Sequence, residues 1–396
     1  MPFPPIEPDP ILTLDGQLRP GRHPGWQEAF LPSATVQCHA ANLLQLTNGD
    51  MACVWFGGTQ EGMADISIWF ARLPRGSSRW TQAVQLSDDA TRSEQNPILF
   101  ETPDNRLHLI WTAQRSGNQD TAIVRSRVSA DSGGTWEPIT TLIDVPGTFV
   151  RQPPIIDGDH WMLPSFLCRV APGERWSGDN DISAVMHSPD AGRSWTRYDV
   201  PDSVGAVHMS IVPGAGGRMV AFYRSRWADA VYRSVSDDKG ITWSAPRPTS
   251  LPNNNASIQA VRLQDGRVAI IHNHASAADA TERRLSLYDE IEDDTEASTA
   301  SPDAPQAAAP TRTAFWGAPR APVSIAVSSD DGLTFDPILD IETGSGYCMT
   351  NNSKERRNRE LSYPSIRQAR DGSIHLAFTY FRRAIKHVIL PLSALS

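Results

Sequence analysis

The stretch SADSGGTW, from Ser129 to Trp136, decides the fold because the same pattern returns three more times along the chain. The later copies are SPDAGRSW at 188–195, SDDKGITW at 236–243 and SSDDGLTF at 328–335. In each copy the aspartate can accept hydrogen bonds from backbone amides of a turn, and the glycine supplies a positive φ. The final aromatic side chain can pack against a sheet. We therefore interpret these boxes as structural turns and not as reactive groups.

Six β-hairpin signals surround the boxes. Each consists of two β-rich runs joined by a turn such as Asn-Gly or Gly-Arg, and they cover residues 42–58, 98–113, 155–166, 210–225, 260–273 and 366–380. Two of the three spacings between successive boxes match the length in residues of a four-stranded propeller blade. The third spacing is long enough for one blade plus an insertion. The sequence therefore predicts an all-β fold, a six-bladed β-propeller with Asp-box repeats, as a single domain over residues 1–396.

Two segments fall outside this repeat pattern. Residues 1–34 are expected to form an N-terminal extension, and the acidic, Ala/Pro-rich run at about 288–315 is expected to be an exposed insertion within blade five. The start of the chain lacks a basic and apolar leader pattern, which predicts a cytoplasmic protein. The four cysteines form no CxxC pair, so we expect free buried thiols.

The net charge of −9 argues against a nucleic-acid partner. No segment has the length and apolarity of a membrane helix, so no membrane partner is expected. The sequence carries no signal for the oligomeric state or for an organic cofactor. His272 and His274 would share one face of a strand, but no third metal ligand is evident, and we expect no metal.

Four Asp boxes on six hairpins resemble the sialidase (neuraminidase) superfamily, and the resemblance extends from about residue 35 to 390. It implies three arginines on a substrate carboxylate, a tyrosine nucleophile, a glutamate that activates it and an aspartate acid/base. Tyr363 in SYPSIRQARDG matches the nucleophile. Arg224 in GGRMVAFYR and Arg320 in WGAPRAPVSIAVSSDDG match two of the arginines.

The other three positions depart from the family pattern. The first arginine is replaced by His39 in CHAANL, the glutamate by His208 in VHMSI and the aspartate by Asn96 in EQNPILF. Glu61 or Asp65 in TQEGMADISIW are candidates for the missing acid.

Further polar residues lie near expected strand openings. Arg151 in FVRQPP can join the arginine cluster, and the other candidates for substrate binding are Arg226, Gln119, Asp120 and Tyr347. Asp120 and Asp229 are also candidate acids. Trp176, Trp227 and Tyr347 are candidates for stacking on a sugar face, although each also suits a packing role.

Three functions follow, all with an acidic oligosaccharide as partner. The first is a sialidase-like exo-acting glycosidase, in which arginines hold a sugar carboxylate, Tyr363 attacks and His208 activates it. The second is a lyase that cleaves a uronate-linked glycoside, such as rhamnosyl-glucuronate, by β-elimination with histidine and tyrosine. The third is a propeller that binds acidic glycans without cleaving them. The resemblance places the glycosidase first.

Overall fold

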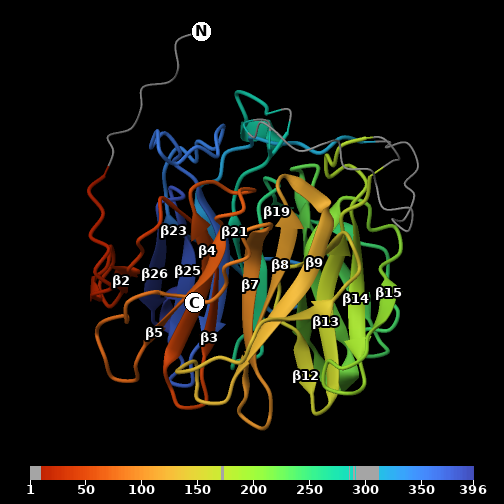
Figure 1. Cartoon of the computed structure of the whole chain (residues 1–396), viewed down its shortest axis with the longest axis horizontal. Coiled ribbons are helices and arrows are strands. Elements are labelled where there is room, and N and C mark those ends of the chain that lie inside the picture. Colours follow the sequence, from red (N-terminus) through yellow and green to blue (C-terminus); the bar gives the residue numbers. More distant parts are fainter. Residues whose placement is uncertain (1–9, 171–173, 285, 289, 291–311) are drawn as a thin grey trace.

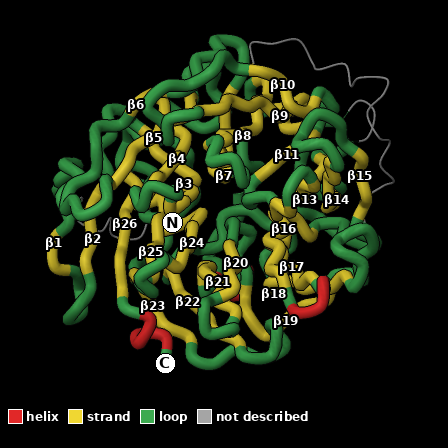
Figure 2. Tube along the Cα trace, turned by 90° about the horizontal axis from the view of Figure 1, so that it is seen from below, coloured by secondary structure: helices red, strands yellow, loops and turns green. Residues whose placement is uncertain are grey.

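The computed structural model describes residues 10–170, 174–284, 286–288, 290 and 312–396 as six antiparallel sheets around a common axis (Figure 1). Figure 2 looks along this axis and shows the sheets arranged as blades in sequence order. The helical structure in this part of the chain consists of three 3₁₀ turns at Ala215–Gly217, Ala277–Asp279 and Leu392–Leu395. The fold is thus the predicted six-bladed β-propeller.

The first three blades run from the inner to the outer strand as the chain proceeds. Blade 1 contains β3 (Gln37–Gln45), β4 (Met51–Gly58), β5 (Ser67–Leu73) and β6 (Val84–Gln85). Blade 2 contains β7 (Ser93–Glu101), β8 (Leu107–Arg115), β9 (Asn118–Ser129) and β10 (Thr140–Ile143). Blade 3 contains β11 (Thr148–Val150), β12 (Ile155–Asp157), β13 (His160–Leu167), β14 (Ile182–Ser188) and β15 (Thr196–Asp199). The inner edge of blade 3 is interrupted between β11 and β12, where Pro153 and Pro154 lack the N–H groups that a ladder needs.

The last three blades follow the same plan, and the sixth combines both ends of the chain. Blade 4 contains β16 (Ala206–Pro213), β17 (Met219–Ser225), β18 (Ala230–Ser236) and β19 (Arg247–Pro252). Blade 5 contains β20 (Gln259–Arg262), β21 (Val268–Asn273), β22 (Val323–Ser328) and β23 (Ile338–Glu342). Blade 6 contains β24 (Leu361–Gln368), β25 (Ile374–Tyr380), β26 (Ala384–Leu390), β2 (Gln27–Phe30) and β1 (Arg19–Pro20). Part of the expected N-terminal extension therefore forms the outer edge of blade 6, while residues 1–9 lie outside the described residues.

The core is divided among the interfaces between blades. Each pair of adjacent blades encloses one cluster of buried apolar side chains, such as Phe70 of blade 1 with Trp111 of blade 2, and Phe222 of blade 4 with Ile270 of blade 5. All four cysteines are free and buried, as predicted. Among the described residues, no helix is long and apolar enough to cross a membrane.

Each of the six predicted hairpins pairs the innermost segment of a blade with the next strand of that blade. The four boxes connect the third strand to the fourth in blades 2 to 5. In the second box, Ser194 donates from its backbone N and its Oγ to the two Asp190 oxygens, at 2.8 and 2.7 Å. The Ser194 bonds lower the pKa of Asp190 to about 2. Gly192 has a φ of 83°, and its N donates to Ser188 Oγ at 2.8 Å. The boxes therefore act as turns, as the sequence indicated.

The insertion between β21 and β22 lies within blade 5, as expected. Most of the predicted exposed segment 288–315 falls outside the described residues. Of its described part, Glu290, Arg312 and Thr313 are exposed, whereas Tyr288 and Phe315 are partly buried and Ala314 is buried.

The second box generates a prediction about stability. Replacing Gly192→Ala forces a residue with a side chain into φ 83°, and its Cβ would lie 2.7 Å from Trp161 Cζ3 in the core. A left-handed residue costs roughly 1–2 kcal/mol, and the contact adds to that cost. We expect chemical denaturation to show a loss of about 2 kcal/mol or more. The matched control is Ala191→Gly, because Ala191 is exposed at φ 56° and gains from glycine. Equal stability of the two variants would contradict this account of the turn.

Candidate active site

A β-bulge near the start of the inner strand positions candidate side chains in four of the blades. The ladders shift register after His39 in β3, Gln95 in β7, Val207 in β16 and Ser362 in β24. At these bulges the backbone is left-handed, with φ values of 60°, 51°, 54° and 51° at Ala40, Asn96, His208 and Tyr363. Such conformations are rare for bulky residues and gather at functional sites. Asn255, immediately before blade 5, has a φ of 57°.

Tyr363 lies at the centre of the site. Arg224 Nη1 donates to Tyr363 Oη at 2.5 Å and lies 3.3 Å from His208 Nε2. The rings of His39 and His208 are centred 4.2 and 5.7 Å from the Tyr363 ring. These side chains are buried, and Tyr363 is only 6% exposed. Blades 1, 4 and 6 thus bring the predicted phenol, both imidazoles and Arg224 together.

Two further predicted arginines approach the same phenol. The guanidinium carbons of Arg151, Arg224 and Arg320 lie 5.5, 5.6 and 5.6 Å from the centre of the Tyr363 ring. Arg151 donates from Nη2 to the Tyr363 and Ala41 carbonyls at 3.1 and 3.0 Å. Arg151 therefore fixes the backbone beneath the phenol, whereas Arg224 and Arg320 flank its ring.

The ion pairs that hold Arg320 were not predictable from the sequence. Arg320 Nη1 donates to Glu360 Oε2 at 2.9 Å, and Arg382 Nε lies 2.7 Å from Glu360 Oε1. Arg382 Nη1 also donates to Glu61 Oε2 at 2.5 Å. Although burial works in the opposite direction, Arg382 and Arg320 lower the pKa of Glu360. Glu61, a candidate acid, is thus engaged by an arginine.

Two arginines of the cluster have no carboxylate partner among the described residues. Arg224 Nε donates to Asn255 Oδ1 at 2.8 Å, while its Nη2 is buried without a hydrogen-bond partner in the described chain. Arg151 Nη1 is likewise buried without a hydrogen-bond partner in the described chain. Burial lowers the pKa of Arg224 to about 9 and that of Arg151 to about 10. A buried guanidinium with an open donor favours an anion as its partner.

Both site histidines are held neutral. Burial, followed by the charges of the neighbouring arginines, lowers the pKa of His39 and of His208 well below 6.5. His39 Nδ1 lies 2.8 Å from Thr379 Oγ1 and 3.5 Å from Glu360 Oε1. Because a carboxylate only accepts hydrogen bonds, we assign the His39 proton to Nδ1 and the lone pair to Nε2. Nε2 is buried and has no partner within the described part of the chain.

The remaining predicted residues lie around this centre or hold loops. Asn96 occupies the bulge of blade 2, and its buried Oδ1 has no partner among the described residues. Arg226 pairs with Asp181 at 2.6 Å and lies among Phe166, Trp176 and Trp316. Asp65 is exposed and accepts from Thr59, and Arg357 lies over the half-buried Tyr347 ring. Burial raises the pKa of Asp120.

Gln119 contacts Tyr288, which is not among the predicted site residues. Its Nε2 donates to Tyr288 Oη at 2.9 Å, and Gln114 Nε2 donates to the same oxygen at 3.3 Å. The neighbouring Leu287 packs in a cluster with Phe149 and Trp176. Residues 287 and 288, from the blade 5 insertion, therefore contact blades 2 and 3 beside the site. A small cavity of about 10 Å³ is lined by Leu287 of this segment and by Arg320 and Glu360 of the site, among others.

The two histidines considered as metal ligands lie in blade 5. His272 Nε2 and His274 Nδ1 are 3.2 Å apart. Among the described residues, no group of three or more histidine, cysteine, aspartate or glutamate side chains could hold a metal ion.

The shared carboxylate of Glu360 leads to a prediction. Glu360→Gln removes the negative charge that Arg320 and Arg382 share and leaves two buried cations close together. Breaking a buried ion pair in this way costs about 3 kcal/mol or more, so the midpoint of denaturation should fall clearly. Glu137→Gln is the control, because Glu137 pairs with Arg106 on the surface and should change stability by less than about 1 kcal/mol. Similar losses in both variants would contradict the role given to Glu360.

Comparisons with known proteins agree with this architecture. The family model described as a BNR repeat-like domain matches residues 49–376. No curated protein sequence matches the chain significantly.

Solved structures share the fold at low sequence identity. The Hadza microbial sialidase Hz136 is 12% identical, with 91% of this chain and 67% of that chain covered and a TM-score of 0.63. The intramolecular trans-sialidase from Ruminococcus gnavus is 13% identical, with 92% and 97% covered and a TM-score of 0.63. A protein of unknown function from Dyadobacter fermentans is 13% identical, with 93% and 99% covered and a TM-score of 0.64. Together with the six blades and the family match, these comparisons lead to one conclusion: the chain belongs to the BNR repeat-like domain family and has the sialidase-like propeller fold.

Proposed function

We propose that this protein is a carbohydrate-active lyase that cleaves a uronate-linked glycoside by β-elimination. One observation carries the proposal: Tyr363 Oη accepts from Arg224 beside two neutral imidazoles, and no carboxylate contacts this hydroxyl among the described residues. The nearby Glu360 and Glu61 are bound by arginines. This set of side chains suits proton transfer by histidine and tyrosine better than activation of a phenol by a carboxylate.

The substrate carboxylate would bind to the guanidinium groups of Arg224 and Arg320. The planar arginine fork can make two parallel charge-assisted hydrogen bonds to a carboxylate. Neutralising the uronate carboxylate makes the proton on the adjacent C5 more acidic. Arg224 has the open nitrogen, and Asn255 fixes its orientation through Nε.

His39 is the base in this proposal. The lone pair assigned to Nε2 takes the C5 proton, while Thr379 and Glu360 at Nδ1 hold the ring and stabilise the imidazolium that forms. The electron pair of the broken C5–H bond becomes the C4=C5 double bond. His208 Nε2 lies 3.3 Å from Arg224 Nη1 and supports the arginine.

Tyr363 is the acid. An arginine can only donate hydrogen bonds, so the phenol oxygen accepts from Arg224 and its own proton is left to donate. As the C4–O bond breaks, this proton passes to the departing oxygen. Proton transfer back from His39, directly or through water, restores the phenol for the next cycle.

A sialidase-type hydrolase is the second candidate. It is favoured by the position of Tyr363 on the inner strand of blade 6, between Arg224 and Arg320, and by sialidases among the structural neighbours. In that case Tyr363 attacks the anomeric carbon and a histidine takes the place of the activating glutamate.

Product analysis distinguishes the candidates. The protein is incubated with oligosaccharides that contain rhamnosyl-glucuronate and, separately, with sialosides. Elimination yields an unsaturated uronate with a new ultraviolet absorbance, and no such absorbance accompanies hydrolysis to free sialic acid. Release of saturated sugar alone would overturn the lyase proposal, and binding without any product would identify a lectin.

Removing the phenol oxygen of Tyr363 tests its role as the acid. Tyr363→Phe keeps the ring that packs against His39 but loses the proton donor, so kcat should fall by about 10²-fold or more. Circular dichroism checks that the fold remains. Tyr198→Phe, on the outer strand β15 of blade 3, is the matched control and should retain activity. Full activity of Tyr363→Phe would exclude the assigned role.

The pH dependence tests the base. His39 works as the neutral imidazole, and its pKa is lowered well below 6.5 by burial and by Arg382. The neutral form therefore persists as the pH falls through 6.5, and the acid limb of kcat/KM should lie clearly below that value. An acid limb at or above 6.5 in a fully folded protein would argue against His39 as the base.

A further inference from the structure

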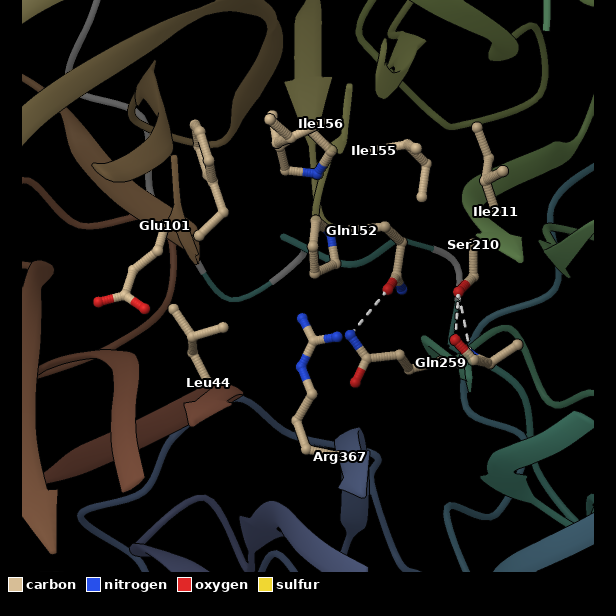
Figure 3. A pocket seen from close by; sticks show the side chains of 13 residues that line it. Leu44, Glu101, Gln152, Ile155, Ile156, Ser210, Ile211, Gln259 and Arg367 are labelled. Carbon is tan, nitrogen blue, oxygen red and sulfur yellow. Dashed lines mark hydrogen bonds between the residues drawn. The ribbon is translucent and has the colours of Figure 1, made fainter. Parts of the chain in front are cut away.

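A second hollow lies at the opposite mouth of the propeller channel. It has a volume of about 270 Å³, and Figure 3 shows its lining from close by. All six blades contribute a residue from their innermost segment, which places the hollow on the propeller axis: Leu44, Phe100, Gln152, Ser210, Gln259 and Arg367.

The hollow is separate from the candidate active site. Tyr363 and Arg367 are both on β24 but four residues apart, which corresponds to at most about 13 Å along a strand. Arg151 fills the channel beneath Tyr363 and donates from Nε to Ser257 Oγ at 3.1 Å. Below it, Gln259 Nε2 donates to Gln152 Oε1 at 3.2 Å. These contacts separate the two mouths.

Arg367 supplies the open hydrogen-bond donors of the hollow. Its Nε donates to the Leu43 carbonyl at 2.9 Å, which fixes the guanidinium, and its end nitrogens have no partner among the described residues. Figure 3 shows the guanidinium pointing into the hollow next to Gln259. Burial lowers the pKa of Arg367 to about 10.

The amide and hydroxyl groups of the hollow are already engaged, whereas Glu101 Oε1 is buried without a hydrogen-bond partner in the described part of the chain. Gln259 Oε1 accepts from Ser365 Oγ and from the Ile366 N, at 2.8 and 2.7 Å. Ser210 Oγ accepts from the Ala260 N at 2.9 Å. The remaining wall is largely apolar, with Leu44, Phe100, Pro153, Pro154, Ile155, Ile156 and Ile211. The hollow thus combines the oriented Arg367 cation, the Glu101 carboxylate and a few engaged polar groups with apolar side chains.

We propose that this axial hollow is a binding site for a small organic monocarboxylate. The carboxylate pairs with the two end nitrogens of Arg367, and the body of the ligand lies against the proline, isoleucine and leucine side chains. Glu101 also lines the hollow, and its Oε2 accepts from the Thr47 N and Oγ1 at 2.7 and 2.8 Å. This fixed negative charge disfavours dianions such as phosphate esters. The volume, below that of pockets for drug-sized molecules, suits a single ring.

Calorimetric titration with benzoate tests the proposal without any use of catalytic activity. Wild-type protein should bind benzoate saturably, and neutral benzamide should bind much more weakly. Arg367→Met keeps the apolar stem but removes the charge, and it should weaken benzoate binding at least about tenfold. The control is Arg370→Met, because Arg370 is exposed two residues past the end of β24 and donates to the Thr47 carbonyl. It should leave the affinity unchanged.

A second variant keeps the test decisive if Arg367→Met fails to fold. Leu44→Trp should fill the hollow and abolish benzoate binding without a change at Arg367. The proposal is overturned if wild-type protein shows no saturable benzoate binding, if benzamide binds equally well, or if folded Arg367→Met and Leu44→Trp retain full affinity, since the benzoate would then be at the catalytic arginines.

Discussion

The antiparallel pairing of β2 with β26 is the interaction on which the propeller depends. Residues Gln27–Phe30 pair with Lys386–Ile389, so the first and last parts of the chain share one sheet. Lys386 Nζ strengthens this pairing through salt bridges with Glu28 of the same sheet and with Glu342 of blade 5, at 2.8 and 2.6 Å. A ring of sheets gains its last inter-blade core only when it is closed, and here closure requires residues that are far apart in sequence.

The candidate active site is a product of this closure. His39 belongs to the first blade and Tyr363 to the last, yet their rings are 4.2 Å apart. Glu360 and Arg382 from blade 6 meet Glu61 from blade 1 at the same interface. Burying several guanidinium groups together is costly, and the shared carboxylates offset only part of that cost. The uncompensated part, at Arg224 and Arg151, supports the proposal that the site binds an anionic sugar.

The fold could be predicted from the sequence because its signals are local. The Asp boxes and hairpin turns depend on residues a few positions apart, and they appear where the pattern placed them. Tyr363, Arg224 and Arg320 were also placed together by resemblance to a known arrangement. The partners of these residues could not be predicted. Nothing near Glu360 in the chain indicates Arg382 as its partner, although YFR at 380–382 echoes FYR at 222–224. Likewise, Gln119 binds Tyr288 from an insertion three blades away.

The left-handed bulge residues have a consequence for how such a site can change. Ala40, Asn96, His208 and Tyr363 have similar positive φ values in four different blades, and main-chain pairing on either side maintains them. The direction of each side chain is therefore set by the sheet and not by the side chain itself. Single substitutions at these positions can exchange one reactive group for another while the scaffold stays the same. A propeller built in this way can diverge in chemistry faster than in shape.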